Sequence, residues 1–360
     1  MHISIIRKTW WQFLVFLVCL LSRKQKPEKL APRAVKKILF VRIDRVGDML
    51  LSQPAIRALK DNFMPAKITV LSSNYNRRVI EGDPCVDEIL SFSGHFFLRS
   101  PVKWIKMVSE LRKRKFDLAI DPYLGFFLAS ALLVRSSRSR WKLGFGSKHA
   151  EYFFNLIAKP DPAPEYEVER SLDLIRSLGI SAESRMPEIR LDKESENKVQ
   201  LLLQENKIND TDLLFGINPG TRRKPHRWKI ENFRYLVELL NGKYRAATLV
   251  FWGPGEKKLA EKTARNLPSA VLAPATDVKL LACFIKRCRV FVCGDTGPFH
   301  IAVAVKTPAV GIFGKSDYRR WAPPESERLR IIRGKPCREI TVGEVMAAVE
   351  ALMENNVAYR

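Results

Sequence analysis

The sequence predicts an α/β protein built from two successive units, each a parallel β-sheet covered by helices on both faces. Three observations predict this fold class. From Lys36 onward, short apolar runs alternate with helix-length segments, a pattern typical of parallel sheets with crossover helices. The alternation breaks in a polar stretch near residues 182–200 and then begins again. With 360 residues, the chain is long enough for two domains of ordinary size.

The first unit is predicted over residues 36–185. Its strands are expected at four apolar runs, residues 37–43, 67–73, 86–92 and 116–122. A helix over residues 47–63 follows the first strand, and an amphipathic helix over 168–180 follows the proline-rich interruption "KPDPAPEYE" (159–167). Residues 186–210 are expected to link the two units.

The second unit is predicted over residues 211–340, where the alternation returns. Strand-plus-turn segments are expected at residues 212–220 and 246–255, and strands at 289–295 and 307–314. The expected helices are residues 230–241 and 256–267. Two Rossmann-like units in succession imply a cleft between them. The stretch "VGEVMAAVEALMEN" predicts a last helix within residues 341–360, which we expect to pack back on the first unit.

Residues 1–35 are expected to form a basic and apolar segment that associates with a membrane. The apolar run "TWWQFLVFLVCLL" (9–21) has 13 residues, which is short for a membrane-spanning helix. Basic residues stand on both sides of it, and no small-residue cleavage site follows. We therefore expect it to lie in the membrane surface, with cations on anionic headgroups. A short spanning anchor and a secretion signal are the alternatives.

The charge of the chain indicates an anionic partner. Its formal net charge is +24, which suits nucleic acid, anionic lipid or a phosphorylated substrate. Nucleic acid is not the expected partner, because the sequence lacks the interleaved basic and aromatic residues and the named motifs of such proteins. The six cysteines include no Cys-x-x-Cys pair, so neither a metal site nor a disulfide framework is expected.

Two nucleotide-binding motifs fail. "GFGSKH" (144–149) has His149 where a dinucleotide fingerprint has its third glycine. "GIFGKS" (311–316) has two residues between its glycines, whereas a Walker loop needs four. The motifs therefore support neither dehydrogenase nor ATPase chemistry.

The stretch "GDTGPFHIAVAVKTPAVGIFG" (294–314) predicts an anion-binding turn. A strand, a short turn and a helix with Pro298 in its first turn follow one another. Such a turn directs backbone N–H groups out of the carboxyl edge of the sheet. Gly297 permits close backbone approach and Thr296 adds a hydroxyl. A capping turn made by Asp295 or Thr296 is the alternative, and His300 fits a packed side chain as well as a ligand contact.

A second candidate is the basic loop "NPGTRRKPHRW" (218–228). Gly220 follows a predicted strand, and five basic residues crowd behind it: Arg222, Arg223, Lys224, His226 and Arg227. Together they could neutralise a diphosphate. A solvated basic loop is the alternative.

The third candidate is "RIDRVGDMLLSQPAIRAL" (42–59), at the first strand–helix junction. Asp48 lies at the mouth of this turn, where a carboxylate could act as a general base towards a hydroxyl bound between the units. An acidic residue that stabilises the helix dipole is the alternative. Asp44 is the second candidate for the base.

These three stretches, in this order, resemble the heptosyltransferases of glycosyltransferase family nine, which have the GT-B fold and assemble the lipopolysaccharide core. The resemblance is carried by "VGDMLLSQPAIRAL", "NPGTRRKPHRW" and "DTGPFHIAVAVKTPAVGIFG" and covers roughly residues 36–355. It implies inverting transfer of a heptose from a nucleoside-diphosphate sugar, with ADP-heptose expected, to a hydroxyl of an anionic, lipid-linked inner core. It implies no cofactor and no metal. The expected place of action is the cytoplasmic face of the inner membrane.

The resemblance also assigns residues. Asp48 would be the general base. The donor side would comprise residues from the two later motifs and the segments around them: Thr221, Lys224, His226, Glu256, Thr276, Asp295, Thr296, Gly297 and His300. Thr296 and Gly297 would hold the diphosphate, Glu256 would approach the ribose and Thr276 the base. His226 departs from the family pattern, which has a lysine there.

The acceptor is expected at basic runs of the first unit. The residues concerned are Arg112, Arg114, Arg138 and Arg140. Two alternatives to the transferase remain at this point: a sugar-nucleotide epimerase of the same fold, and a basic nucleic-acid-binding protein.

Overall fold

The computed structural model describes residues 23–92, 100–160, 166–183, 185–209 and 211–355, together with Val15 and Cys19. The rest of the segment 9–21, for which membrane association is expected, lies outside the described residues. Val15 and Cys19 are helical and are buried in one hydrophobic cluster with Leu39 and Val41 of the first sheet. Within the described part of the chain, no helix is long and apolar enough to cross a membrane.

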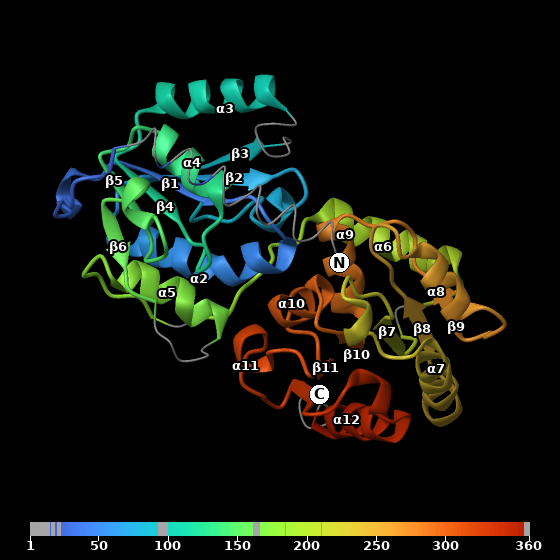
Figure 1. Ribbon diagram of the computed structural model, residues 1–360. Coiled ribbons are helices and arrows are strands. Elements are labelled where there is room, and N and C mark those ends of the chain that lie inside the picture. The colour runs from blue at the N-terminus through green and yellow to red at the C-terminus, as the bar shows by residue number, and fades with distance from the viewer. Residues whose placement is uncertain are drawn as a thin grey trace.

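The first unit contains a six-stranded parallel sheet of order β3-β2-β1-β4-β5-β6. Its strands are β1 (Lys37–Arg42), β2 (Lys67–Ser73), β3 (Glu88–Phe92), β4 (Leu118–Asp121), β5 (Trp141–Phe145) and β6 (Leu156–Ala158). Its helices are α2 (Val46–Asn62), α3 (Pro101–Arg114), α4 (Leu128–Ser136) and α5 (Glu167–Arg176). Helices α2 and α5 cover one face, and α3 and α4 lie on the other (Figure 1).

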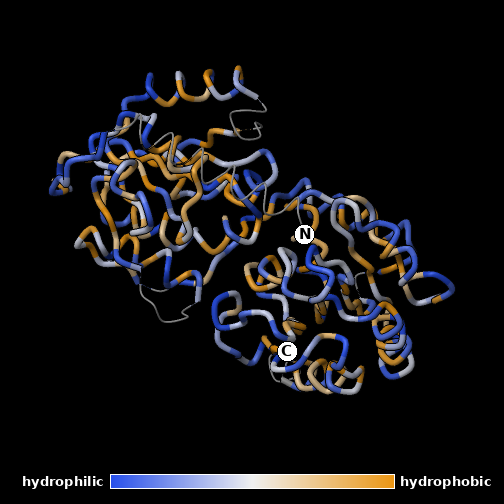
Figure 2. The backbone as a smooth tube through the Cα atoms, in the orientation of Figure 1, coloured by the Kyte–Doolittle hydropathy of each residue, from blue (hydrophilic) through white to orange (hydrophobic). Residues whose placement is uncertain are grey.

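The second unit repeats this plan with a six-stranded parallel sheet of order β12-β11-β10-β7-β8-β9. Its strands are β7 (Leu214–Asn218), β8 (Ala247–Val250), β9 (Ala270–Leu272), β10 (Val290–Gly294), β11 (Ala309–Gly314) and β12 (Leu329–Arg333). Its helices are α6 (Lys193–Glu205), α7 (Ile230–Tyr244), α8 (Lys257–Ala264), α9 (Val278–Arg287), α10 (Gly297–Ala304), α11 (Tyr318–Trp321) and α12 (Val342–Asn355). The apolar strands run through the interior of both units (Figure 2). The predicted fold class is therefore confirmed.

Two expectations about the ends of the second unit need correction. The predicted linker contains helix α6, which begins at the Asp192 cap, where Ser195 N–H donates to Asp192 Oδ1 at 2.8 Å. This helix packs on α9 and so belongs to the second unit. The last helix, α12, does not return to the first unit as expected. It packs on α7 and on the second sheet, because Val345, Val349 and Leu352 complete the hydrophobic cluster there.

The sheet order fixes where a ligand site belongs. In each sheet the chain reverses its direction of winding beside the first strand, between β1 and β4 in one unit and between β7 and β10 in the other. Open parallel sheets bind ligands outside the carboxyl ends of the strands at such a switch point. Helices α2 and α10, which leave these two edges, pack on each other and join the units. A continuous hydrophobic cluster also runs from α2 and α5 to α9 and α10.

Candidate active site

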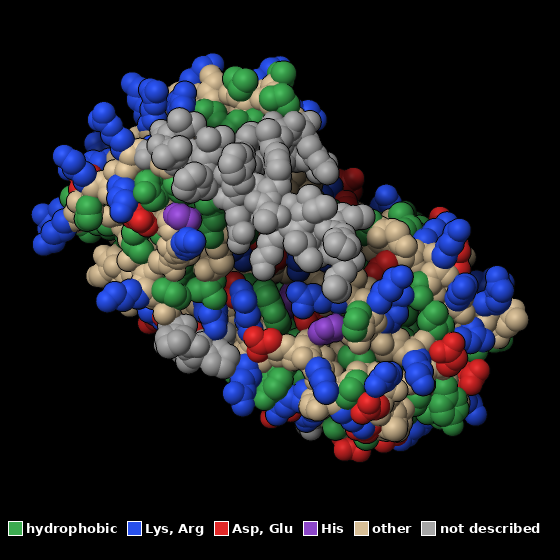
Figure 3. Space-filling view, in the orientation of Figure 1, with side chains coloured by type: hydrophobic (Ala, Val, Ile, Leu, Met, Phe, Trp, Pro, Cys, Tyr) green, Lys and Arg blue, Asp and Glu red, His purple; other side chains and the backbone are tan. Residues whose placement is uncertain are grey.

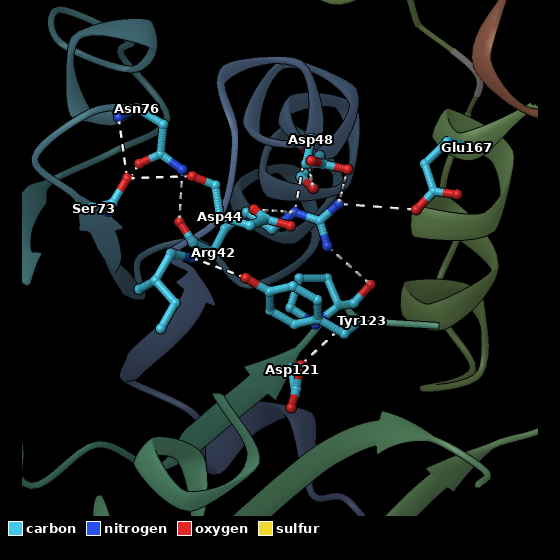
Figure 4. Close-up of polar contacts among 11 residues, drawn as sticks. Arg42, Asp44, Asp48, Ser73, Asn76, Asp121, Tyr123 and Glu167 are labelled. Atoms are coloured by element: carbon cyan, nitrogen blue, oxygen red, sulfur yellow. Dashed lines mark hydrogen bonds and ion pairs between the residues drawn. The ribbon is translucent and has the colours of Figure 1, made fainter. Parts of the chain in front are cut away.

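Asp48 lies in the first turn of α2, directly after β1, as the sequence predicts. Its side chain is 13% exposed, and its Oδ1 lies 3.5 Å from Nη2 of Arg42. Ser52 Oγ donates a hydrogen bond of 2.8 Å to the Asp48 carbonyl, which secures the first turn of the helix. The carboxylate is therefore held at the carboxyl edge of the first sheet (Figure 4). It lies on the helix that packs against α10.

Arg42, the last residue of β1, is the centre of a buried polar cluster. Its side chain is 2% exposed, and it approaches three carboxylates: Asp44 at 3.4 Å, Asp48 at 3.5 Å and Glu167 at 3.8 Å. Its guanidinium also stacks on the Tyr123 ring at 4.7 Å. Burial alone would lower the pKa of Arg42, but the acidic neighbours, led by Asp44, raise it. Arg42 therefore stays a cation that orders the carboxylates around it.

Two further carboxyl groups lie at this edge and differ from Asp48 in their surroundings. Burial raises the pKa of Asp44 to about 6, although Arg42 opposes the shift. Burial also raises the pKa of Asp121, at the end of β4, to about 7. Asp44 Oδ1 is buried without a hydrogen bond. Of these three aspartates, Asp48 is the one whose charge acts on the second unit, on His300 together with Asp295 and on Arg222. Asp48 is thus the carboxylate that faces the second unit.

His300 of α10 forms the other side of this contact. It is 5% exposed, and a Cβ at Gly47 would lie 2.7 Å from its Cδ2. Burial lowers its pKa, against the charges of Asp295 and Asp48, so the ring is neutral at physiological pH. Its Nδ1 is buried without a hydrogen-bond partner among the described residues. His300 therefore packs between the units, with one ring nitrogen buried and unpaired among the described residues.

The turn from residue 294 to residue 297 has the geometry of the predicted anion site. Thr296 is the residue before α10, but neither it nor Asp295 caps the helix with a side-chain hydrogen bond. Thr296 Oγ1 instead donates to the Gly294 carbonyl at 3.3 Å. A Cβ at Gly297 would meet nothing within 4 Å, so there is open space beside this backbone. The side-chain capping alternative is therefore wrong. Pro298 has no N–H and Phe299 N–H donates to the Thr296 carbonyl at 3.1 Å, so in this turn it is the N–H of Gly297 that can face an anion.

The basic loop after β7 lies at the same junction. The pKa of Arg222 is lowered, chiefly by the positive charge of Arg45 at the start of α2. Arg45 of the first unit and Arg222 of the second therefore lie close enough for their positive charges to repel each other. Such an arrangement would be stabilised by an anion bound between them. Thr221 is 5% exposed, and its carbonyl accepts a hydrogen bond of 3.0 Å from Arg227. Lys224 is exposed in a short turn of 3-10 helix (Lys224–His226).

His226, the departure from the family pattern, has a specific partner. Its Nδ1 lies 2.5 Å from Oγ of Ser316. Ser316 is the last residue of "GIFGKS", the motif that fails as a Walker loop. The hydrogen bond between the His226 imidazole and the Ser316 hydroxyl therefore joins the basic loop to the residues that follow β11.

Glu256 and Thr276 are placed differently. The Glu256 carboxylate fills the space that a side chain at Gly220 would need, and its Oε2 accepts a hydrogen bond of 3.2 Å from Gly253 N–H. Burial, and then the charge of Glu256, raise the pKa of Tyr75, so Glu256 faces the first unit. Thr276 lies between β9 and α9, and among the described residues it makes no hydrogen bond with Glu256 or Thr221.

Comparison with known proteins decides the family. The model of a family described as "Glycosyltransferase family 9 (heptosyltransferase)" matches residues 104–344, which is more than half of the chain. The chain belongs to glycosyltransferase family 9. This glycosyltransferase is 27% identical over 289 residues to lipopolysaccharide heptosyltransferase 3 of Escherichia coli strain K12, with 77% of this chain and 82% of that protein covered.

Solved structures share the fold of the family 9 enzyme. A glycosyl transferase family 9 protein from Veillonella parvula has a TM-score of 0.83 and 18% identity, covering 90% of this chain and 99% of its own. ADP-heptose lipopolysaccharide heptosyltransferase II of Escherichia coli has a TM-score of 0.76 and 20% identity, covering 89% of this chain and 99% of its own. These likenesses confirm the GT-B fold.

In this glycosyltransferase, the four arginines expected to bind the acceptor do not lie beside Asp48. Arg112 and Arg114 end α3, and Arg138 and Arg140 precede β5, so all four lie at the amino edge of the sheet. Two of these arginines also form ion pairs with acidic side chains: Arg114 with Glu88 and Glu110, and Arg140 with Glu28. Asp48 follows the carboxyl end of β1, so these arginines lie at the opposite edge of the sheet from it, and their contact with the acceptor stays a prediction.

The sequence reasoning missed four residues of the site: Arg42, Tyr123, Glu167 and Arg320. One signal was present. The run "KILFVR" ends in an arginine that follows four apolar residues, Ile-Leu-Phe-Val. A charged side chain in a buried strand needs polar partners. Nothing local identifies those partners, because they come from the end of β4, from α5 and from α11.

Proposed function

We propose that this family 9 enzyme transfers a heptose from ADP-heptose to a hydroxyl of the lipopolysaccharide inner core, with inversion at the anomeric carbon. The observation that carries the proposal is the position of Asp48 on the first unit, opposite the open backbone of Gly297 and the basic loop on the second. The names of the relatives support the sugar and the acceptor. The Escherichia coli structure described as an ADP-heptose heptosyltransferase supports the donor.

The chemistry follows from which unit carries each group. Asp48 takes the proton of the acceptor hydroxyl while its oxygen attacks the anomeric carbon, and the bond from that carbon to the diphosphate breaks. The diphosphate leaves towards the start of α10, where the Gly297 N–H and the helix dipole stabilise its charge together with Arg222. The base and the leaving group lie on different units, so the attack comes from the face opposite the departing group. This arrangement yields inversion.

His300 and Thr296 would orient the donor. A neutral imidazole with an unpaired Nδ1 can donate or accept one hydrogen bond without adding charge to the site. Thr296 Oγ1 can accept a further bond while it donates to Gly294. Glu256, at the start of α8, would accept a hydrogen bond from a ribose hydroxyl.

The test compares Asp48→Asn with Asp44→Asn in the full chain. We expect Asp48→Asn to lower kcat for transfer by about 10²–10⁴-fold, the usual contribution of a general base. Its affinity for ADP, measured by calorimetry, should stay within about threefold of wild type, since the base does not contact the nucleotide. If Asp44→Asn abolishes transfer and Asp48→Asn does not, the base is Asp44. Thermal shifts with ADP-heptose, UDP-sugars and GDP-sugars would test the donor.

We further propose that the enzyme works at the cytoplasmic face of the inner membrane and that α3 touches the lipid. This helix buries only Leu111, whereas Val102 and Ile105 are 63% and 66% exposed. Lys103 and Lys106 flank them and are also exposed. In Figure 3, hydrophobic side chains surface among Lys and Arg at the top of the first unit, where Figure 1 places α3.

This membrane proposal is tested by sedimentation with vesicles of phosphatidylglycerol or of phosphatidylcholine. The double change Val102→Glu and Ile105→Glu should lower binding to the anionic vesicles about tenfold, through lost insertion and added repulsion. Leu201→Glu is the matched control, because Leu201 is 60% exposed on α6 of the second unit. Equal binding of both variants would refute the role of α3.

A further inference from the structure

A chain of alternating charges leads from the proposed base to the second unit. Nη2 of Arg42 lies 3.5 Å from Asp48 Oδ1 and 3.8 Å from Glu167 Oε1. The other oxygen of Glu167, Oε2, accepts a hydrogen bond of 2.8 Å from Nε of Arg320. Asp48, Arg42 and Glu167 belong to the first unit, and their side chains point towards one another (Figure 4). Arg320 belongs to α11 of the second unit.

We propose that Arg42 positions the carboxylate of Asp48, and that the ion pair between Glu167 and Arg320 keeps Arg42 in place while the two units are docked. The three residues are positioning residues that act through Asp48. The inference rests on the proposed role of Asp48 as the base. It assigns a function to residues that neither the motifs nor the expected donor contacts include.

Arg42 fixes Asp48 at two points. Its Nε donates to the Asp48 carbonyl at 3.2 Å, and its Nη2 donates to the carboxylate at 3.5 Å. A third group, Nη1, donates to the Pro122 carbonyl at 3.4 Å. Because the Arg42 side chain is 2% exposed, water cannot replace a lost partner. The orientation of this guanidinium therefore sets the direction of the Asp48 carboxylate.

Asp48 and Glu167 compete for the same atom, Nη2 of Arg42. Glu167 is 4% exposed, so its charge is also poorly screened by water. As long as Arg320 satisfies Glu167, the competition is weak. Without Arg320, Arg42 becomes the nearest cation to Glu167, and the guanidinium is drawn away from Asp48. The remaining charged neighbour, Asp44, contacts Nε of Arg42 rather than Nη2.

The same short segment of the second unit also carries a donor-side contact. Ser316 bonds to His226 of the basic loop, and Arg320 follows it four residues later. A change in the basic loop can therefore reach Glu167 through the start of α11. This arrangement couples the alignment of the base to the position of the donor-binding loop.

The test is steady-state kinetics of Arg320→Gln beside Arg319→Gln. Arg319 is the neighbouring residue on the same short helix and contacts Tyr318 rather than Glu167, so its loss is the matched control. Arg320→Gln should lower kcat about tenfold or more, since small misplacements of a reacting group are costly. KM for donor and acceptor should stay within about threefold, because Arg320 pairs with Glu167 and acts through Asp48 in this inference. Arg320→Lys should restore most of kcat.

The deciding variant is Glu167→Gln combined with Arg320→Gln. Removing the negative charge at residue 167 ends the competition for Arg42, so the double variant should recover kcat to within about threefold of Glu167→Gln alone. A purely structural role would make the double variant as slow as Arg320→Gln or slower. That outcome, or equal kcat for Arg320→Gln and Arg319→Gln, overturns the inference. Full activity of Asp48→Asn would instead refute the proposed base.

Discussion

The buried carboxyl group of Asp121 makes a stability prediction that can be worked out from the structure. It ends β4, is 3% exposed, and accepts a hydrogen bond of 3.2 Å from Tyr123 N–H. Burial raises its pKa from 3.8 to about 7. At about 1.4 kcal/mol for each pH unit between these values, ionisation of Asp121 destabilises the folded state by about 4 kcal/mol.

The sign of the pH dependence follows from the raised pKa. Between about pH 4 and pH 7 the folded protein keeps a proton on Asp121 that the unfolded chain has lost. The contribution of Asp121 to stability therefore falls as the pH rises through this window. Asp121→Asn removes the titration and keeps an oxygen to accept from Tyr123. The new buried NH₂ group adds a constant penalty of about 1–3 kcal/mol.

Urea unfolding followed by circular dichroism at pH 4, 5.5 and 8 would test this prediction. The free energy of unfolding of Asp121→Asn minus that of wild type should rise by about 4 kcal/mol from pH 4 to pH 8, roughly half of it by pH 5.5. Asp317→Asn is the control. Asp317 is exposed and makes no side-chain cap, so its substitution should change stability by no more than about 0.5 kcal/mol at any pH. A constant difference between Asp121→Asn and wild type would refute the reasoning.

Two further predictions concern the junction and the second core. Gly47→Ala should improve helix propensity by about 1 kcal/mol. It should nevertheless lower kcat/KM for transfer at least several-fold, because the new Cβ would lie 2.7 Å from Cδ2 of His300 and force α10 away from α2. Wild-type activity of this variant would show that the contact between α2 and α10 can shift freely. Trp228→Phe should lower the free energy of unfolding, measured in urea, by about 1–3 kcal/mol. The indole is 2% exposed, and its N–H donates a hydrogen bond of 2.8 Å to the Ile340 carbonyl. A loss of less than about 0.5 kcal/mol would mean that this hydrogen bond contributes little.

Much of the fold could be predicted from local patterns. The long strands and the helices that follow them have enough residues to display a period, and the turns after β1, β7 and β10 carry the motifs. Strands β5, β6, β9 and β12 were missed. Strands β6 and β9 have three residues each, too few for an alternation to appear, and β5 (WKLGF) and β12 (LRIIR) carry basic residues among their apolar ones. The partner of the last helix was also missed, because an apolar face predicts burial but does not identify the surface that buries it.

In the candidate site too, residues set by local sequence could be predicted, whereas contacts between distant segments could not. Asp48, Thr296 and Gly297 could be placed from their position after a strand, since backbone geometry at such a turn is local. The contacts of Arg42 with Glu167, and of Glu167 with Arg320, depend on how α5 and α11 pack, which no local pattern reports. The edge of the sheet at which the four arginines lie could not be predicted for a related reason. A basic run predicts exposure, but it does not tell which edge of a sheet the run will occupy.

The hydrophobic cluster that spans both units limits how halves of such enzymes can be recombined. A chimera of two family members would place an α2 from one protein against an α10 from the other, so the close contact made here by Gly47 and His300 would have to form between residues of different proteins. A mismatch there would disturb folding and the reaction centre together, since Asp48 is the next residue along the helix. Exchange of acceptor preference by grafting should therefore succeed better with loops of the first unit than with the unit as a whole.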